Sequence, residues 1–186
     1  MSVPKQRDLA DAVAADHQTM TGLFAELEAS GDARNRGQLA ARVIEELVRH
    51  SVAEEQFLYP AARAALPDGE EVADRAIAVH AEAEQLMKSL ARTDPTTPAF
   101  DEQVTTLLAA MRRHFADEEG ALLPRLRATC DAGELRELGL RFEQAHRIAP
   151  TRPHPAAPDT PPANKIVDLG VGLIDRVRDA MTGRNK

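Results

Sequence analysis

One motif, a histidine followed by paired glutamates and a proline, occurs twice in this chain of 186 residues. It begins at His50 as HSVAEEQFLYPAAR and again, 64 residues later, at His114 as HFADEEGALLPRLR. The segments before the two copies echo each other more weakly, with His17 and His80 in matching positions. Repeats of this length are typical of supersecondary units that pack against one another. The chain is therefore expected to contain a duplicated helical hairpin.

The residues around the repeat favour helices. Residues 8–147 are rich in Ala, Leu, Glu, Gln and Arg, which have high helix propensity. Turn sequences with Gly, Pro and Asp divide this region into long segments. The predicted helices cover residues 8–30, 36–66, 70–92 and 99–128, with a shorter helix at 132–148. Because short connections between long amphipathic helices favour antiparallel neighbours, the sequence predicts an all-α, up-down-up-down four-helix bundle.

A proline-rich segment follows the predicted bundle. Six prolines fall between Pro150 and Pro162, which excludes a helix there and indicates an extended strap. Helical periodicity then resumes, and the charges beside its apolar stripe favour docking over membrane anchoring. The predicted organisation is a bundle at 1–148, a proline-rich linker at 149–164 and an amphipathic C-terminal helix at 165–186. That helix is a candidate surface for homo-oligomers.

Charge and composition exclude several classes of protein. The chain has 30 acidic and 23 basic residues, and its net charge of −7 argues against binding nucleic acid through bulk positive charge. No apolar run reaches membrane-spanning length, and the N-terminus lacks the apolar core of a secretory signal. The single cysteine, Cys130, excludes an internal disulfide and fits a reducing compartment. A soluble cytoplasmic protein without a membrane partner is expected.

The repeated histidines are expected at one height in the bundle. In antiparallel helices, residues at equal height are equidistant from the intervening turn, and the midpoints between successive histidines fall in or beside the predicted turns. Since positions i and i+4 share a helix face, His50 and Glu54 lie together on an apolar stripe, as do His114 and Glu118. The groups predicted to converge on the bundle interior are His17, His50, Glu54, His80, His114 and Glu118.

This convergence points to a metal site. Burying so many ionisable groups together is costly unless they are paired or bind a metal. Imidazole and carboxylate donors without a thiolate suit iron or manganese better than structural zinc. His146 and His154 fall outside the pattern and are expected to take no part in the site. Glu55 and Glu119 lie about 140° around the helix from their histidines, so they are expected at its periphery or on the surface.

The spacing of these residues resembles that of the hemerythrin-like family with an HHE cation-binding domain. The resemblance covers residues 8–128, and the PTRPHP of the tail is similar to that of actinobacterial members. It implies two non-haem iron ions joined by an oxo or hydroxo bridge. Glu54 and Glu118 would be bridging carboxylates, and the four repeated histidines would be terminal ligands.

The chain departs from the oxygen-carrying hemerythrins in its third helix. Those proteins have His-x-x-x-His there, whereas this sequence reads His80-Ala-Glu-Ala-Glu84, so Glu84 is the expected replacement ligand. The carboxylate of the fourth helix comes four residues after His114 rather than five, where Glu119 stands as the alternative. The ligand set implied by the resemblance is His17, His50, Glu54, His80, Glu84, His114 and Glu118.

Tyr59 is a further alternative ligand, because some bacterial relatives use a tyrosine at this position. An ideal helix would turn Tyr59 away from His50, and only a distortion of the helix at Pro60 would bring it close.

The expected function follows from an anionic replacement ligand. Such a ligand stabilises ferric iron and disfavours reversible oxygen carriage, so decomposition of hydrogen peroxide, a catalase-like reaction, is expected. Counting ligands on two octahedral irons leaves one open position, on the iron bound by His17 and His50, where H2O2, O2 or NO would bind. The alternative is a non-catalytic protein that binds or senses O2, NO or iron.

Overall fold

Every regular element in the described part of the chain, residues 7–149 of the computed structural model, is helical. The helices are α1 (Leu9–Ala29), α2 (Ala33–Ala53), α3 (Tyr59–Ala65), α4 (Gly69–Leu90), α5 (Pro98–Asp117), α6 (Leu123–Thr129) and α7 (Ala132–Ile148). Two π-helical turns, η1 (Glu54–Leu58) and η2 (Glu118–Leu122), join α2 to α3 and α5 to α6. The four long helices and the shorter fifth one predicted from the sequence are thus confirmed. The predicted linker and C-terminal helix lie outside the described residues.

Aspartate side chains cap three of the helices, α1, α2 and α7. Asp8 accepts a hydrogen bond of 2.8 Å from the backbone N–H of Asp11 at the start of α1, and Asp32 does the same for Asn35 at the start of α2. Asp131 accepts one of 2.7 Å from Gly133 at the start of α7. Each cap satisfies a donor that the first helical turn leaves unpaired.

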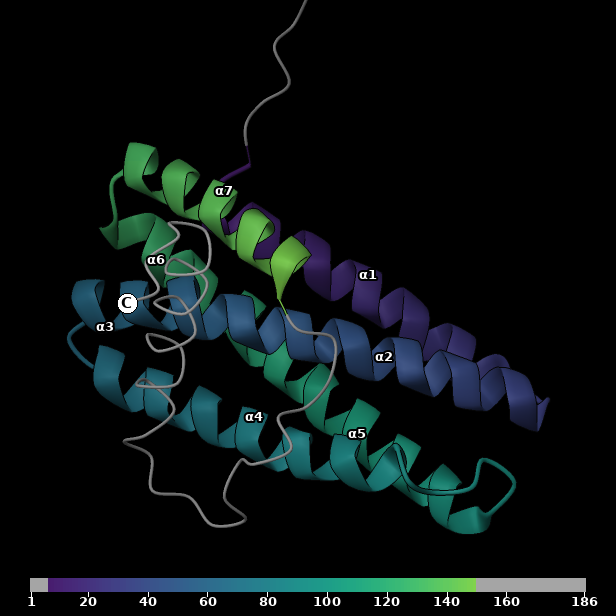
Figure 1. Ribbon diagram of the computed structural model, residues 1–186. Coiled ribbons are helices and arrows are strands. Elements are labelled where there is room, and N and C mark those ends of the chain that lie inside the picture. The colour runs from purple at the N-terminus through teal and green to yellow at the C-terminus, as the bar shows by residue number, and fades with distance from the viewer. Residues whose placement is uncertain (1–6, 150–186) are drawn as a thin grey trace, which may run out of the picture.

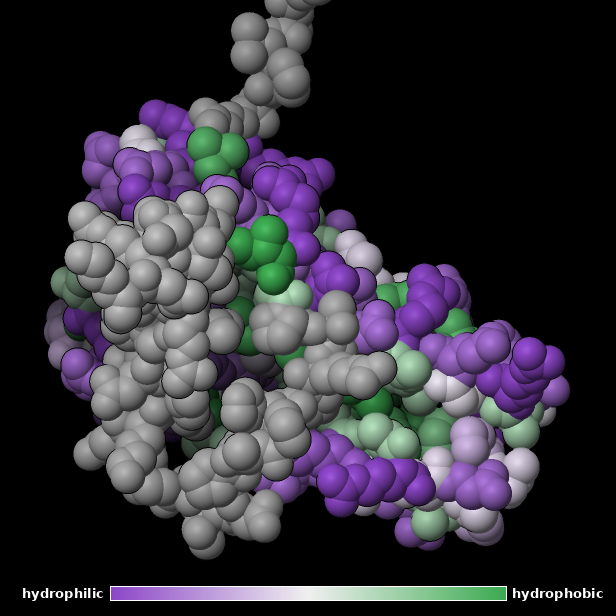
Figure 2. Space-filling model, viewed as in Figure 1, coloured by the Kyte–Doolittle hydropathy of each residue, from purple (hydrophilic) through white to green (hydrophobic). Residues whose placement is uncertain are grey.

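The long helices run up and down beside one another, as Figure 1 shows. α7 packs along α1 and α2, outside the four-helix core. Its approach is close, because a Cβ atom at Gly139 would lie 2.7 Å from the backbone carbon of Asp8. Within residues 7–149, no helix is long and apolar enough to cross a membrane. The face seen in Figure 2 is largely hydrophilic along the described helices, with scattered apolar residues.

The two π-helical turns occupy equivalent places in the repeat. In each, a backbone N–H bonds five residues back, from Tyr59 to Glu54 and from Leu123 to Glu118. A proline follows directly, and it has no N–H with which to continue the regular α-helical pattern. A π turn holds one additional residue, so every later side chain is rotated back by about 100°. The repeated proline therefore changes which residues face the bundle interior.

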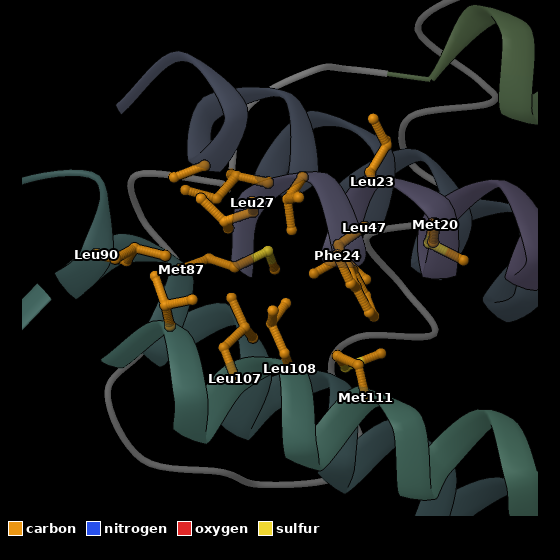
Figure 3. Packing of buried hydrophobic residues seen from close by; sticks show 14 of the residues in the cluster. Met20, Leu23, Phe24, Leu27, Leu47, Met87, Leu90, Leu107, Leu108 and Met111 are labelled. Carbon is orange, nitrogen blue, oxygen red and sulfur yellow. The ribbon is translucent and has the colours of Figure 1, made fainter. Parts of the chain in front are cut away.

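Two apolar clusters fill the bundle, one on each side of the histidine layer. The first lies toward the α1–α2 turn, and Figure 3 shows its leucines, methionines and Phe24 pointing toward one another from α1, α2, α4 and α5. The second lies toward the α3–α4 turn and includes side chains from α7. Burying one such leucine or phenylalanine contributes about 1.5–3 kcal/mol. On α1, α2 and α4 the repeated histidine falls between residues of the two clusters, and on α5 His114 lies beside Phe115 at the end of the first cluster. This arrangement confirms their predicted common height.

Candidate metal centre

Six buried polar side chains gather between the two apolar clusters. Among residues 7–149, these are all of the buried histidines and carboxylates, and none is more than 5% exposed. Each histidine comes from a different long helix, and each glutamate is the first residue of a π-helical turn. The six are His17, His50, Glu54, His80, His114 and Glu118. They are the groups that the sequence predicts to converge.

Their inward-facing atoms form two adjacent groups that could each hold a metal ion. One group contains His17, His50, Glu54 and Glu118, and the other contains Glu54, His80 and His114.

Glu54 belongs to both groups. Its Oε2 lies 3.1 Å from Nε2 of His50 and 3.3 Å from Nε2 of His80. Glu118 also spans the two groups, with Oε2 3.4 Å from Nε2 of His17 and Oε1 3.6 Å from Nε2 of His114. Both carboxylates are thus placed between the groups.

Several of these buried atoms have no hydrogen-bond partner among the described residues. They are Nε2 of His17, Nε2 of His50, Oε1 of Glu54 and Oε2 of Glu118. In the second group, Nε2 of His80 and Nε2 of His114 face each other at 3.0 Å. Leaving buried polar atoms unsatisfied is costly, whereas a cation between them would satisfy imidazole nitrogens and carboxylate oxygens together. The donor set therefore fits a pair of metal ions.

A metal ion that binds this cluster would have to displace protons from the histidines. Burial alone lowers the pKa of His17, but the carboxylates of Glu118 and Glu54 outweigh it and raise this pKa from 6.5 to about 10. His80 is likewise raised to about 10, against its burial, by Glu54 and Glu55. Burial raises the pKa of Glu54, but the histidines, His50 first, hold it well below 4.5. Without a metal, protons on the imidazoles balance the buried carboxylates.

In each group, a carboxylate from the repeat holds the outer nitrogen of one histidine. Nδ1 of His17 lies 2.8 Å from Glu119 and Nδ1 of His80 lies 3.0 Å from Glu55, which are equivalent residues of the repeat. Such a contact fixes the proton on Nδ1, orients the ring and leaves Nε2 free to bind a metal. Glu55 and Glu119 thus lie at the periphery of the site, in agreement with the sequence.

Asp16 is a functional residue that sequence reasoning missed. Its carboxylate lies 2.9 Å from Nδ1 of His50 and orients that ring, as the carboxylate of Glu119 orients the ring of His17. The sequence contained a signal for this difference between the two halves of the repeat. The residue before His17 is the acid Asp16, whereas the residue before the equivalent His80 is Val79. His114 accordingly has no carboxylate hydrogen-bonded to its Nδ1 among residues 7–149.

The hydroxyl of Tyr59 lies at the centre of the second group. It is 2.9 Å from Oε1 of Glu118 and 3.1 Å from both Oε2 of Glu54 and Nε2 of His80. Without η1, Tyr59 would face about 180° away from His50. The π turn brings Tyr59 inward. This is the distortion of the helix at Pro60 that the sequence analysis required for Tyr59 to come close to the site. Burial and the two glutamates raise the pKa of the phenol well above 10.

Glu84 lies outside both groups. It is one turn beyond His80 on α4, but its side chain is a quarter exposed and its Oε1 lies 3.4 Å from Nζ of Lys88. The predicted role of Glu84 as a ligand therefore stays a prediction. His154 lies outside the described residues. His146 is not in either group, although its Nε2 lies 3.2 Å from Asp16.

Comparisons with known proteins identify the family of this chain and several of its relatives. The family model of the hemerythrin HHE cation binding domain matches residues 8–126. An uncharacterized hemerythrin-like protein of Schizosaccharomyces pombe is 28% identical over 186 positions, covering 95% of this chain and 88% of its own length. A DNA nickase of Nostoc is 25% identical over 140 positions, covering 74% of this chain but 39% of that protein.

The fold also matches a solved structure. The crystal structure of a hemerythrin HHE cation binding domain-containing protein from Mycobacterium kansasii has a TM-score of 0.64 and 23% identity to this chain. The match covers 76% of this chain and 88% of the other. By its helical bundle, its buried histidines and glutamates and the matched residues 8–126, the chain belongs to the hemerythrin HHE cation-binding domain family.

Proposed function

We propose that this protein holds a pair of iron ions and decomposes hydrogen peroxide. The observation that carries the proposal is the pair of buried ligand groups that share Glu54. A shared carboxylate is suited to bridging two ions, and an oxo or hydroxo bridge would complete the pair. Nitrogen and oxygen donors without sulfur suit iron, and Cys130 belongs to neither group.

Bound iron would supply a two-electron couple for peroxide. One H2O2 takes up two electrons and two protons and becomes two waters, while a second releases two electrons and two protons and becomes O2. The chain's own residues hold and shield this chemistry. The ring of Phe115 stacks on His17 with centroids 4.1 Å apart, which places an apolar wall beside the cluster. We expect the protein to act on peroxide in the cytoplasm.

The remaining ligand decides between peroxide chemistry and oxygen carriage. An anionic oxygen donor stabilises ferric iron more than a neutral imidazole does, because opposite charges attract at short range. Two residues could supply it, Tyr59 and Glu84. The central place of the Tyr59 hydroxyl supports the tyrosine, since Glu84 would first have to leave its contact with Lys88.

Oxygen release from peroxide tests the proposed function. Protein loaded with iron is expected to release one O2 for every two H2O2 consumed, over many turnovers per chain. The matched control is His17→Ala, which removes a ligand from the first group. Binding of O2 or NO without peroxide turnover would contradict the proposal and favour the alternative binding or sensing role.

Replacing Tyr59 by phenylalanine is expected to remove a visible absorption band from the ferric protein. A phenolate bound to ferric iron absorbs visible light by charge transfer, and phenylalanine cannot bind. Iron affinity at the second group should also fall by about tenfold or more, since even indirect partners of a metal contribute about 10–100-fold. An unchanged spectrum at equal iron content would show that Tyr59 is not a ligand.

The matching variant Glu84→Gln is expected to keep both ions and the visible band. Glutamine preserves the size of the side chain and removes its charge, and loss of the ion pair with Lys88 costs about 0.5 kcal/mol of stability or less. Iron analysis and the absorption spectrum decide the point. Loss of one ion per chain in Glu84→Gln would establish Glu84 as the ligand that the sequence predicts.

A further inference from the structure

We infer that His146 on α7 is a positioning residue for the metal centre, acting through Asp16 on His50. The inference rests on the proposed metal pair. It concerns a residue from outside the four-helix core, which the spacing of the repeat places outside the site.

The contacts form a continuous chain from α7 to the first ligand group. One oxygen of Asp16, Oδ2, lies 2.9 Å from Nδ1 of His50. The other oxygen, Oδ1, lies 3.2 Å from Nε2 of His146. The two oxygens of a single carboxylate are thus divided between a residue that faces the metal site and a residue of α7.

The carboxylates around His146 indicate which of its ring nitrogens carries the proton. Nε2 of His146 faces Asp16 and, at 3.6 Å, Oε2 of Glu46. A nitrogen that faces two carboxylates is favourable only when it carries the ring proton, so the ring proton is assigned to Nε2. Its alignment falls short of a full hydrogen bond to either acid. The contact therefore acts mainly through charge and dipole.

The contact between His146 and Asp16 is shielded from water, and α7 holds the His146 ring in place. The carboxylate side chain of Asp16 is 11% exposed, so little water is available to balance its charge. Phe142, one turn earlier on α7, stacks against the ring of His146 at 6.4 Å. The helix thus holds the imidazole in place over Asp16.

The expected consequence is confined to one of the two metal ions. An oriented carboxylate on Nδ1 keeps Nε2 of His50 aimed at the first group and raises its basicity. Loss of His146 leaves Asp16 free to turn toward the surface pocket that both residues line between α1, α2 and α7. The second group contains neither His50 nor His17, so its ion should be held as before.

The test measures metal release from the full-length protein loaded with cobalt(II), which requires no redox activity. Wild-type protein is mixed with an excess of chelator, and the two ions are followed as separate phases by absorption. His146→Leu is expected to speed one phase by about tenfold and leave the other unchanged. His146→Gln, which restores an N–H donor at similar reach, should return release to within about twofold of wild type.

Two further variants separate positioning from general loosening of α7. Leu135→Ala removes a buried α7 side chain that is not part of the Asp16 contact, and it should not speed one phase selectively. In an Asp16→Ala background, His146→Leu should add nothing, because the link to His50 is already broken.

Equal acceleration of both phases, an additive double mutant or an unchanged His146→Leu would each overturn the inference. Absence of peroxide turnover would overturn the proposed function alone, since cobalt release does not depend on it. A chain that takes up no cobalt would contradict the metal centre, and the positioning role with it.

Discussion

Replacing Glu54 by alanine is expected to reduce the metal content from two ions per chain to none. Glu54 is the one residue that belongs to both ligand groups found among residues 7–149, so its loss removes a donor from each ion. Breaking a buried charge cluster in this way also costs about 3–5 kcal/mol of folding stability. Metal analysis and thermal unfolding of the purified variant measure the two effects.

Glu55→Ala is the matched control for this substitution. Glu55 is the next residue in the chain, but it contacts the outer nitrogen of His80 rather than the inward-facing atoms. This variant should keep both ions at saturating metal, with an affinity about 10–100-fold lower for one of them. Equal metal loss in Glu54→Ala and Glu55→Ala would show that Glu54 does not bridge the pair.

The metal-free protein is expected to lose stability as the pH rises from about 6.5 to about 10. Folding raises the pKa values of His17 and His80 from 6.5 to about 10. A raised pKa means that the folded state binds protons more tightly than the unfolded state does, so their stabilisation is complete below pH 6.5. It is lost as the pH passes through the folded pKa values, at a cost on the order of a few kcal/mol.

Metal-loaded protein should show the opposite trend. Metal ions bind neutral imidazoles and must displace these protons, so affinity rises with pH over the same window. The gap between the melting temperatures of loaded and metal-free protein should therefore widen from pH 6.5 to pH 10. His17→Gln, which cannot take up the proton, should reduce the pH dependence of the metal-free protein. A constant gap across this range would contradict the coupling.

The helices and the histidine layer could be predicted because they follow regular geometry. The i, i+4 relation places His50 with Glu54 and His114 with Glu118, and antiparallel packing around short turns brings the four histidines to one height. All six of the buried polar groups were identified in this way. Family resemblance added the expectation of iron but was not needed for the geometry.

The role of Tyr59 could not be derived from regular geometry, because it depends on a local departure from the α-helix. An uninterrupted helix turns Tyr59 outward, and the π turn η1 reverses that direction. The signal was present in the repeated Pro60 and Pro124, each of which lacks the N–H that a regular helix needs. Glu84 lies one helical turn from His80, as the predicted ligand role requires, but its carboxylate contacts Lys88.

The contact between Asp16 and His146 could not be predicted because it joins distant parts of the chain. Nothing in the spacing of the repeat places α7 against α1 and α2, and this packing brings His146 to Asp16.

The most direct test of the metal centre is to count and place the ions in protein made in iron-replete medium. Metal analysis should give two irons per chain, and anomalous scattering from crystals should place them on either side of Glu54 and Glu118. One zinc per chain without iron, or iron bound away from these two carboxylates, would contradict the dinuclear iron centre.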